Sequence, residues 1–183
     1  RHRQDHHARV GGGAFAAGEP LRVVSNTLSH PSGLAGIPAS YGRAFSSKRV
    51  RAPGGGRRSL GEVRITGSIA CEMVLVASGV FQYSFFIGSH IWDVAAGVVL
   101  IQEAGGEVLE WRGGQWLPFQ AFVGTSQKPD ESCSQALRRW SAPLLVGAPE
   151  IVTYLASRTK VRRKPLSSIA RKIRAFGARD KRR

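Results

Sequence analysis

The chain has 183 residues, 42% of them apolar and 21% charged, with a formal net charge of +15 at pH 7. This length is enough for one domain with a sizeable core, and no apolar run approaches the roughly 18 residues of a membrane-spanning helix, so we expect a soluble protein. Cys71 and Cys133 are too few for a disulfide framework and lie in no metal-binding spacing, so we expect a reduced, cytoplasmic setting.

The N-terminal part is predicted to form a β-hairpin over about residues 6–24, with turns at Gly11-Gly12-Gly13 and Gly18. Residues 27–62 differ in composition, because they are rich in Gly, Pro and Arg. This composition predicts a divergent, flexible loop rather than a packed element. We therefore separate a hairpin segment, residues 1–26, from a Gly/Pro/Arg-rich loop, residues 27–62.

Residues 63–157 carry the helices and strands of the predicted domain. A helix is expected over about residues 68–78, with Ser68 as its N-cap and Cys71 as a small core residue. The further elements are predicted as a strand over 80–87, a helix from 93, a strand over 107–111, a helix ending at 137–140, a strand over 143–146 and a helix over 150–156. Strands that alternate with helices favour an α/β layer in which helices cover a sheet.

The helix from residue 93 begins with an acidic residue. Asp93 opens a run whose apolar residues at 94, 98, 101 and 104 form one face of a 3.6-residue period, and Gly105-Gly106 end it. A carboxylate there can accept hydrogen bonds from free backbone N–H groups, which stabilises a helix by about 1 kcal/mol. It can also bind a hard cation such as Mg²⁺, which shares its remaining positions with water and substrate phosphate. The spacing alone does not separate these two roles.

Gly67 and Ser68 open the preceding helix. A Gly-Ser turn at a helix start exposes backbone N–H groups at the positive end of the helix dipole, which favours a phosphate or a sugar hydroxyl. The alternative is that Ser68 only caps its helix.

Three segments of the chain resemble one protein family. Residues 92–97 (Trp-Asp-Val-Ala-Ala-Gly) with 103–106 (Glu-Ala-Gly-Gly) are similar to the C-terminal signature of the inositol monophosphatase-like family of metal-dependent phosphatases. Residues 64–79 resemble the family's Gly-Ser/Thr-Ala segment and its following helix, and residues 8–23 resemble its hairpin with a Gly-Ala-Phe element. The segments occur in the family's order and cover roughly residues 8–155, with a poor fit from about 27 to 60.

The resemblance implies the C-terminal half of a layered α-β-α-β-α sugar-phosphatase fold, with a mixed sheet flanked by helices. Residues 1–26 would then be a remnant of the N-terminal sheet, and residues 63–157 the C-terminal phosphatase domain. Family members carry most of their metal ligands earlier in the chain, in a Glu-containing helix and an Asp-Pro-x-Asp-Gly-Thr motif, and neither pattern occurs in these 183 residues. The only methionine is Met73, so Arg1 is not an initiator. We expect an incomplete chain with little or no activity by itself.

The function that the resemblance implies is a Mg²⁺-dependent phosphomonoesterase acting on a small sugar, inositol or nucleotide phosphate. Asp93 would bind Mg²⁺, and Gly67, Ser68 and Ile69 would contact the substrate. Arg64 either assists an anionic substrate or is a solvated arginine on a strand. No residue of this chain is assigned a catalytic role.

Three other acidic or aromatic positions bear on the site. Glu72 and Glu103 lie on the two predicted helices, where they either support the site or act as solvated or capping groups. Phe86 stands seven residues before the metal-binding Asp, where inositol-cleaving members place a Glu that hydrogen-bonds the inositol ring. An apolar ring cannot accept those hydrogen bonds, which argues against inositol monophosphate. Phe86 either packs in its strand or stacks on a base.

The C-terminal tail, residues 158–183, holds 12 Lys and Arg residues and one acid, Asp180, so its net charge is +11 and the rest of the chain carries +4. From Pro165 onward apolar residues recur at steps of three and four, which predicts a basic amphipathic helix. Such a helix can contact an anionic membrane or nucleic-acid phosphates, or pack its apolar stripe on this domain or on the other subunit of a homodimer. The alternative function is thus a non-catalytic protein of the family fold that binds anionic partners through this tail.

Overall fold

The computed structural model describes residues 5–24, 32–38, 40, 45–47, 61–122 and 132–161. The predicted amphipathic helix after Pro165 and much of the predicted loop over residues 27–62 lie outside the described residues. Within these ranges, no helix has the length and the apolar character needed to cross a membrane.

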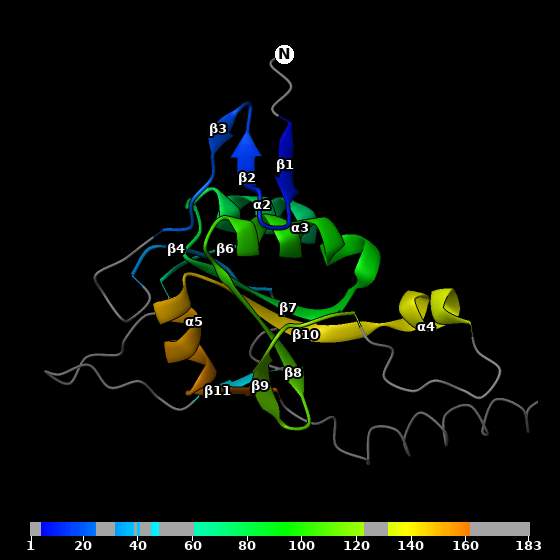
Figure 1. Ribbon diagram of the computed structural model, residues 1–183. Coiled ribbons are helices and arrows are strands. Elements are labelled where there is room, and N and C mark those ends of the chain that lie inside the picture. The colour runs from blue at the N-terminus through cyan, green and yellow to red at the C-terminus, as the bar shows by residue number, and fades with distance from the viewer. Residues whose placement is uncertain are drawn as a thin grey trace, which may run out of the picture.

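The described residues form three sheets and four helices, in the order of the chain (Figure 1). The strands are β1 (His6–Arg9), β2 (Gly13–Ala16), β3 (Glu19–Pro20), β4 (Leu34–Gly36), β5 (Phe45–Ser47), β6 (Glu62–Arg64), β7 (Tyr83–His90), β8 (Glu107–Arg112), β9 (Gln115–Pro118), β10 (Ser141–Gly147) and β11 (Thr159–Val161). The helices are α2 (Ile69–Ala77), α3 (Ile91–Glu103), α4 (Cys133–Arg139) and α5 (Pro149–Ala156).

The central layer is a six-stranded mixed sheet in the order β6-β4-β7-β10-β8-β9. In Figure 1, α2 and α3 cover one face of this sheet, α5 lies on the other face, and the small sheet β1-β2-β3 lies on the far side of α2 and α3. One apolar cluster fills the space between the sheet, α2 and α3, and a second fills the space between the sheet and α5. The predicted mixed sheet flanked by helices is therefore confirmed.

The direction of three strands determines where the helices begin. β4 pairs in parallel with both β6 and β7, so these three strands run the same way. α2 follows β6 and α3 follows β7, and each helix returns over the sheet (Figure 1). Both helices consequently start at the carboxyl edge of the parallel strands, which is where open α/β sheets bind their ligands.

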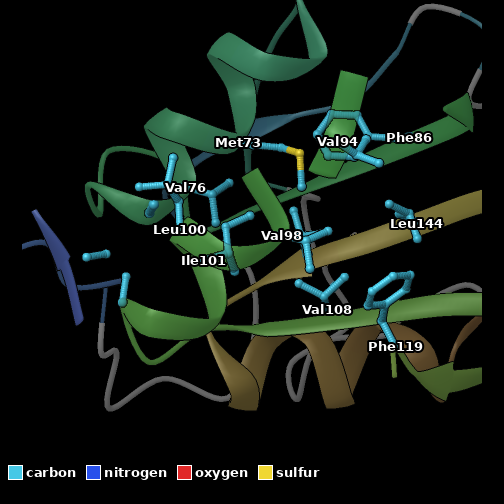
Figure 2. Close-up of a cluster of buried hydrophobic side chains, with 14 of the residues drawn as sticks. Met73, Val76, Phe86, Val94, Val98, Leu100, Ile101, Val108, Phe119 and Leu144 are labelled. Carbon is cyan, nitrogen blue, oxygen red and sulfur yellow. The ribbon is translucent and has the colours of Figure 1, made fainter. Parts of the chain in front are cut away.

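The apolar face predicted for α3 is the one that the structure buries. Val94, Val98, Ile101 and Ala104 are each at most 3% exposed. Figure 2 shows the side chains of α2, α3 and the sheet meeting in this cluster. The 3.6-residue period of the sequence is thus confirmed as the cause of the helix and of its orientation.

α2 and α3 approach each other most closely at Gly97. A Cβ atom on Gly97 would lie 2.4 Å from the sulfur and 2.7 Å from the Cβ of Met73, which is fully buried on α2. Any larger residue at position 97 would therefore separate the two helices. Hydrogen in place of a side chain sets the distance between them.

A carboxylate ties the N-terminal hairpin to the other end of α3. Glu103 accepts hydrogen bonds from the backbone N–H of Gly11 at 2.8 Å and of Gly13 at 2.9 Å. Both glycines have positive φ, at 71° and 87°, which is the backbone geometry of this turn. The two N–H groups stabilise the ionised form, so the pKa of Glu103 lies below its ordinary value. Glu103 therefore has a capping role, at the hairpin turn.

Two predictions are wrong. Residues 34–36 of the predicted loop form the buried strand β4 between β6 and β7, and Ile37, which follows, is 5% exposed. Cys71 is exposed instead of lying in the core, because α2 directs Met73 and Val76 to the cluster and turns residue 71 away from it. The proposed domain boundaries remain predictions.

Gly97→Ala is expected to destabilise the fold, although Ala stabilises most helix interiors by about 0.5–1 kcal/mol relative to Gly. The added methyl group must displace Met73, so the free energy of unfolding should fall by about 1–3 kcal/mol in urea denaturation. Ala96→Ser on the exposed side of the same helix is the control and should change it by less than about 0.5 kcal/mol. A Gly97→Ala protein at least as stable as the wild type would contradict the close contact.

Glu103→Gln is expected to lower stability at neutral pH more than in acid. Because the native pKa of Glu103 is lowered, the ionised carboxylate stabilises the fold above the ordinary carboxyl pKa, and this contribution is lost as the pH falls through the lowered native value. Urea denaturation from about pH 7 to about pH 3 should show the two unfolding free energies converging in acid. A difference independent of pH would show that charge is not involved.

Candidate functional site

The start of α3 holds Asp93. The helix begins at Ile91 with His90 as its N-cap, so Asp93 is the third helical residue rather than the first. Its Oδ2 atom accepts a hydrogen bond from the backbone N–H of His90 at 3.4 Å, a long and therefore weak contact. Within the described residues its Oδ1 atom accepts none. The side chain is half-buried, so one oxygen remains available to a cation or to water.

The start of α2 holds the Gly67-Ser68 turn. The predicted cap is confirmed, because the Ser68 Oγ atom accepts from the backbone N–H of Cys71 at 3.3 Å. The Ser68 N–H donates to the Thr66 Oγ1 atom at 3.2 Å, so both polar groups of Ser68 have partners. The backbone N–H groups of Gly67, Ile69 and Ala70 find no acceptor in the part of the chain that the structure describes. The available donors are therefore the neighbours of Ser68.

These two helix starts are adjacent. Met73 lies five residues after Ser68, Gly97 lies four residues after Asp93, and Met73 and Gly97 are in contact. Since both helices begin at the same sheet edge, the contact aligns their first turns. The structure thus brings Asp93 and the Gly67–Ile69 turn to neighbouring helix N-termini, while their roles as metal ligand and substrate contacts remain predictions.

Arg64 lies three residues before Gly67, at the end of β6. Its guanidinium is exposed, forms an ion pair with Glu62 on the same strand, and donates from Nη1 to the carbonyl of Val63 at 3.0 Å. The side chain is thus engaged locally, as a solvated strand arginine would be. A substrate contact would require it to leave Glu62, and that role also remains a prediction.

Among the described residues Asp93 is the carboxylate with an available oxygen at this edge, whereas Glu72 is engaged by Thr66. Nowhere in the described ranges do three His, Cys, Asp or Glu side chains gather closely enough to hold a metal ion. Asp93, half-buried with an available oxygen, fits one ligand position of Mg²⁺, which uses one or two protein carboxylates. Other oxygen ligands would have to come from elsewhere.

Phe86 does not face a ligand. It is 3% exposed and belongs to the cluster with Met73 and Val94, so packing is confirmed and base stacking is excluded (Figure 2). Across the sheet it pairs with Leu144, which pairs in turn with Glu110 on β8. Burial raises the pKa of Glu110, against the opposing charge of Arg112. The carboxylate closest to position 86 in this line of cross-strand neighbours is therefore that of Glu110, two strands away.

Sequence reasoning missed three residues near the helix starts. The His90 ring stacks on Trp92 with centroids 4.6 Å apart, and Trp92 is 64% exposed beside Asp93. Thr66 orders the turn before α2. A histidine two residues before the Trp92-Asp93 pair was the available signal for the first contact. Thr66 lies in the segment that resembles the family, but sequence reasoning assigned it no role.

Residues 2–141 match the sequence profile described as the inositol monophosphatase family. The chain belongs to this family. It is 32% identical over 114 residues to the probable inositol 1-monophosphatase ImpA of Mycobacterium tuberculosis, a match that covers 56% of this chain and 42% of that protein. It is 37% identical over 112 residues to human inositol monophosphatase 2, covering 58% and 38%.

Solved structures share the fold of this family member. The inositol monophosphatase of Anabaena matches with a TM-score of 0.52 and 24% identity over 84% of this chain and 54% of that one. Inositol monophosphatase-II of Staphylococcus aureus matches with a TM-score of 0.53 and 20% identity, covering 84% and 51%. The chain thus spans about two fifths of the length of these curated relatives and about half of these solved chains.

Proposed function

We propose that the protein containing this chain is a Mg²⁺-dependent phosphomonoesterase acting on a small phosphorylated substrate. The carrying observation is that Asp93 and the free N–H groups beside Ser68 lie at adjacent helix starts on one sheet edge. A carboxylate that can ligate a cation next to N–H groups that can bind an anion is the combination that a metal-assisted phosphatase needs. Membership of the phosphatase family supports the same reaction class.

The chemistry divides between the metal and the chain. When bound, Mg²⁺ would activate the attacking water and stabilise the charge that grows on the leaving oxygen. Asp93 would hold one coordination position of the ion. The N–H groups of Gly67, Ile69 and Ala70, at the positive end of the α2 dipole, would bind phosphate or hydroxyl oxygens and orient the substrate.

We propose a sugar or nucleotide phosphate rather than an inositol phosphate as the substrate. The buried Phe86 offers no hydrogen bond to a polyol ring, and a site without that partner loses much of its discrimination for one. One relative supports a sugar phosphate, because the protein of Thermotoga maritima, 34% identical over 113 residues, is named fructose-1,6-bisphosphatase/inositol-1-monophosphatase.

The measurement that tests this function is phosphate release from several phosphomonoesters, with and without Mg²⁺, by the longest natural chain that contains these residues. Asp93→Asn should reduce the rate by more than the about 10–100-fold that loss of an outer-shell partner costs. Glu150→Gln, at the exposed start of α5, is the control and should leave the rate unchanged. Residues 1–183 alone should release little phosphate, because one carboxylate does not replace a cluster. If the full-length protein releases no phosphate and Asp93→Asn changes nothing, the enzymatic function is excluded.

We also propose that the tail, residues 158–183, adds contact with nucleic acid or an anionic membrane, because it concentrates a charge of +11. Binding to DNA and to anionic vesicles should weaken steeply with salt, and deletion of residues 162–183, which leaves β11 in place, should abolish most of it. The control is the same deletion assayed for phosphate release, which should not change. Equal binding by both proteins would exclude this role.

A further inference from the structure

Glu72 is a buried carboxylate in the first turns of α2. Its side chain is 7% exposed, and no ion pair to it forms within the described residues. Its Oε1 atom accepts hydrogen bonds from the backbone N–H of Thr66 at 3.2 Å and from the Thr66 hydroxyl at 3.0 Å. Burying a carboxylate is costly unless hydrogen bonds compensate, and both of these donors belong to one residue of the turn before the helix.

The other carboxylate oxygen lies over Gly36 of β4. A Cβ atom on Gly36 would be 2.6 Å from Glu72 Oε2 and 2.2 Å from Ser84 Oγ of β7. Ser84 is fully buried, and its hydroxyl has no hydrogen-bond partner among the described residues. Two buried polar side chains therefore converge on a space that exists only because residue 36 has no side chain.

Thr66 transmits the position of Glu72 to the turn. Its hydroxyl oxygen lies 3.2 Å from the backbone N–H of Ser68 and 3.2 Å from the carbonyl of the same residue. Between them, Gly67 has a φ of +79°, a conformation that favours glycine. With both ends of this three-residue turn held, the N–H groups of Gly67, Ile69 and Ala70 are left as donors without acceptors in the described chain.

We infer that Glu72 is a positioning residue: its carboxylate, seated over Gly36, holds Thr66 so that the Gly67–Ala70 N–H groups converge on a phosphate oxygen. This inference rests on the proposed function, because it concerns the turn proposed to bind the substrate. Glu72 itself does not touch the substrate. It acts through Thr66 and Ser68.

The charge of Glu72 opposes this role, so the effect of its charge can be separated from the effect of its hydrogen bonds. A buried negative charge near a phosphate weakens anion binding, so any benefit of Glu72 must come from geometry. Glu72→Gln keeps an oxygen acceptor of the same reach and removes the charge, whereas Glu72→Ala removes both. Geometry therefore predicts opposite results for the two variants.

The experiment is titration of inorganic phosphate into the longest natural chain, followed by the amide NMR signals of Gly67, Ile69 and Ala70 and by calorimetry. Glu72→Ala and Thr66→Val should weaken phosphate binding about tenfold, the order of one charge-assisted hydrogen bond. Gly36→Ala should weaken phosphate binding to the same extent although residue 72 is still Glu, because the added methyl group displaces the Glu72 carboxylate. Glu72→Gln should bind phosphate at least as well as the wild type.

Glu103→Gln is the matched control. Glu103 is also a helix carboxylate that accepts two backbone N–H bonds and orders a glycine turn, but at the opposite end of α3. It should change stability and leave phosphate affinity unchanged. In active protein, Glu72→Ala should raise KM more than it lowers kcat, since substrate contact is disturbed and Asp93 is not.

The inference is overturned if folded Glu72→Ala or Gly36→Ala binds phosphate as tightly as the wild type, if Glu72→Gln is as weak as Glu72→Ala, or if phosphate shifts none of the three amide signals in the wild type. Should Glu72→Ala not fold, Thr66→Val and Gly36→Ala carry the test. Absence of phosphatase activity with intact phosphate binding would remove the proposed function and leave this inference standing.

Discussion

The contact between Met73 and Gly97 is the constraint on which the rest of the structure depends. It places α2 against α3 with no side chain between them on the α3 side, and so makes the two helices a single layer over the sheet. Because the strands before both helices are parallel, this layer has both N-termini at one edge. A shift of one helix along the other would move the Gly67-Ser68 turn away from Asp93. The geometry of the candidate site is therefore a consequence of core packing rather than of the surface.

The two ends of α3 carry carboxylates with opposite relations to the helix dipole. Asp93 lies near the positive end, where a negative charge is favourable, and it keeps an available oxygen there. Glu103 lies at the negative end, where a carboxylate is unfavourable, and two backbone N–H groups of the hairpin compensate it. α3 thus carries the candidate metal ligand at its first turn and the attachment of the hairpin at its last turn. The hairpin can be attached firmly without interfering with the carboxyl edge of the sheet.

Patterns within a few residues of one another predicted most of what the structure contains. The period of Val94, Val98 and Ile101 identified the buried face of α3, and the Gly-Ser pair located the cap of α2. β4 could not be found in this way, because Leu34–Gly36 is three residues long, contains a glycine, and is stabilised by partners about 30 and 50 residues later in the chain. The contact of Glu72 with Gly36 could not be predicted for the same reason, since it depends on a strand that sequence periodicity does not show.

The exposed Trp92 gives the protein an optical signal at its own candidate site. Its indole lies one residue from Asp93, stacked on the His90 ring, whereas Trp140 is 1% exposed in the core. Emission from a solvent-exposed indole lies at longer wavelength and responds more to nearby charge than emission from a buried one. Trp111 and Trp116 are half-buried on β8 and β9, so Trp92 is the most exposed of the four tryptophans. The long-wavelength part of the tryptophan fluorescence is therefore weighted toward the first turn of α3, and no label has to be introduced to follow what arrives there.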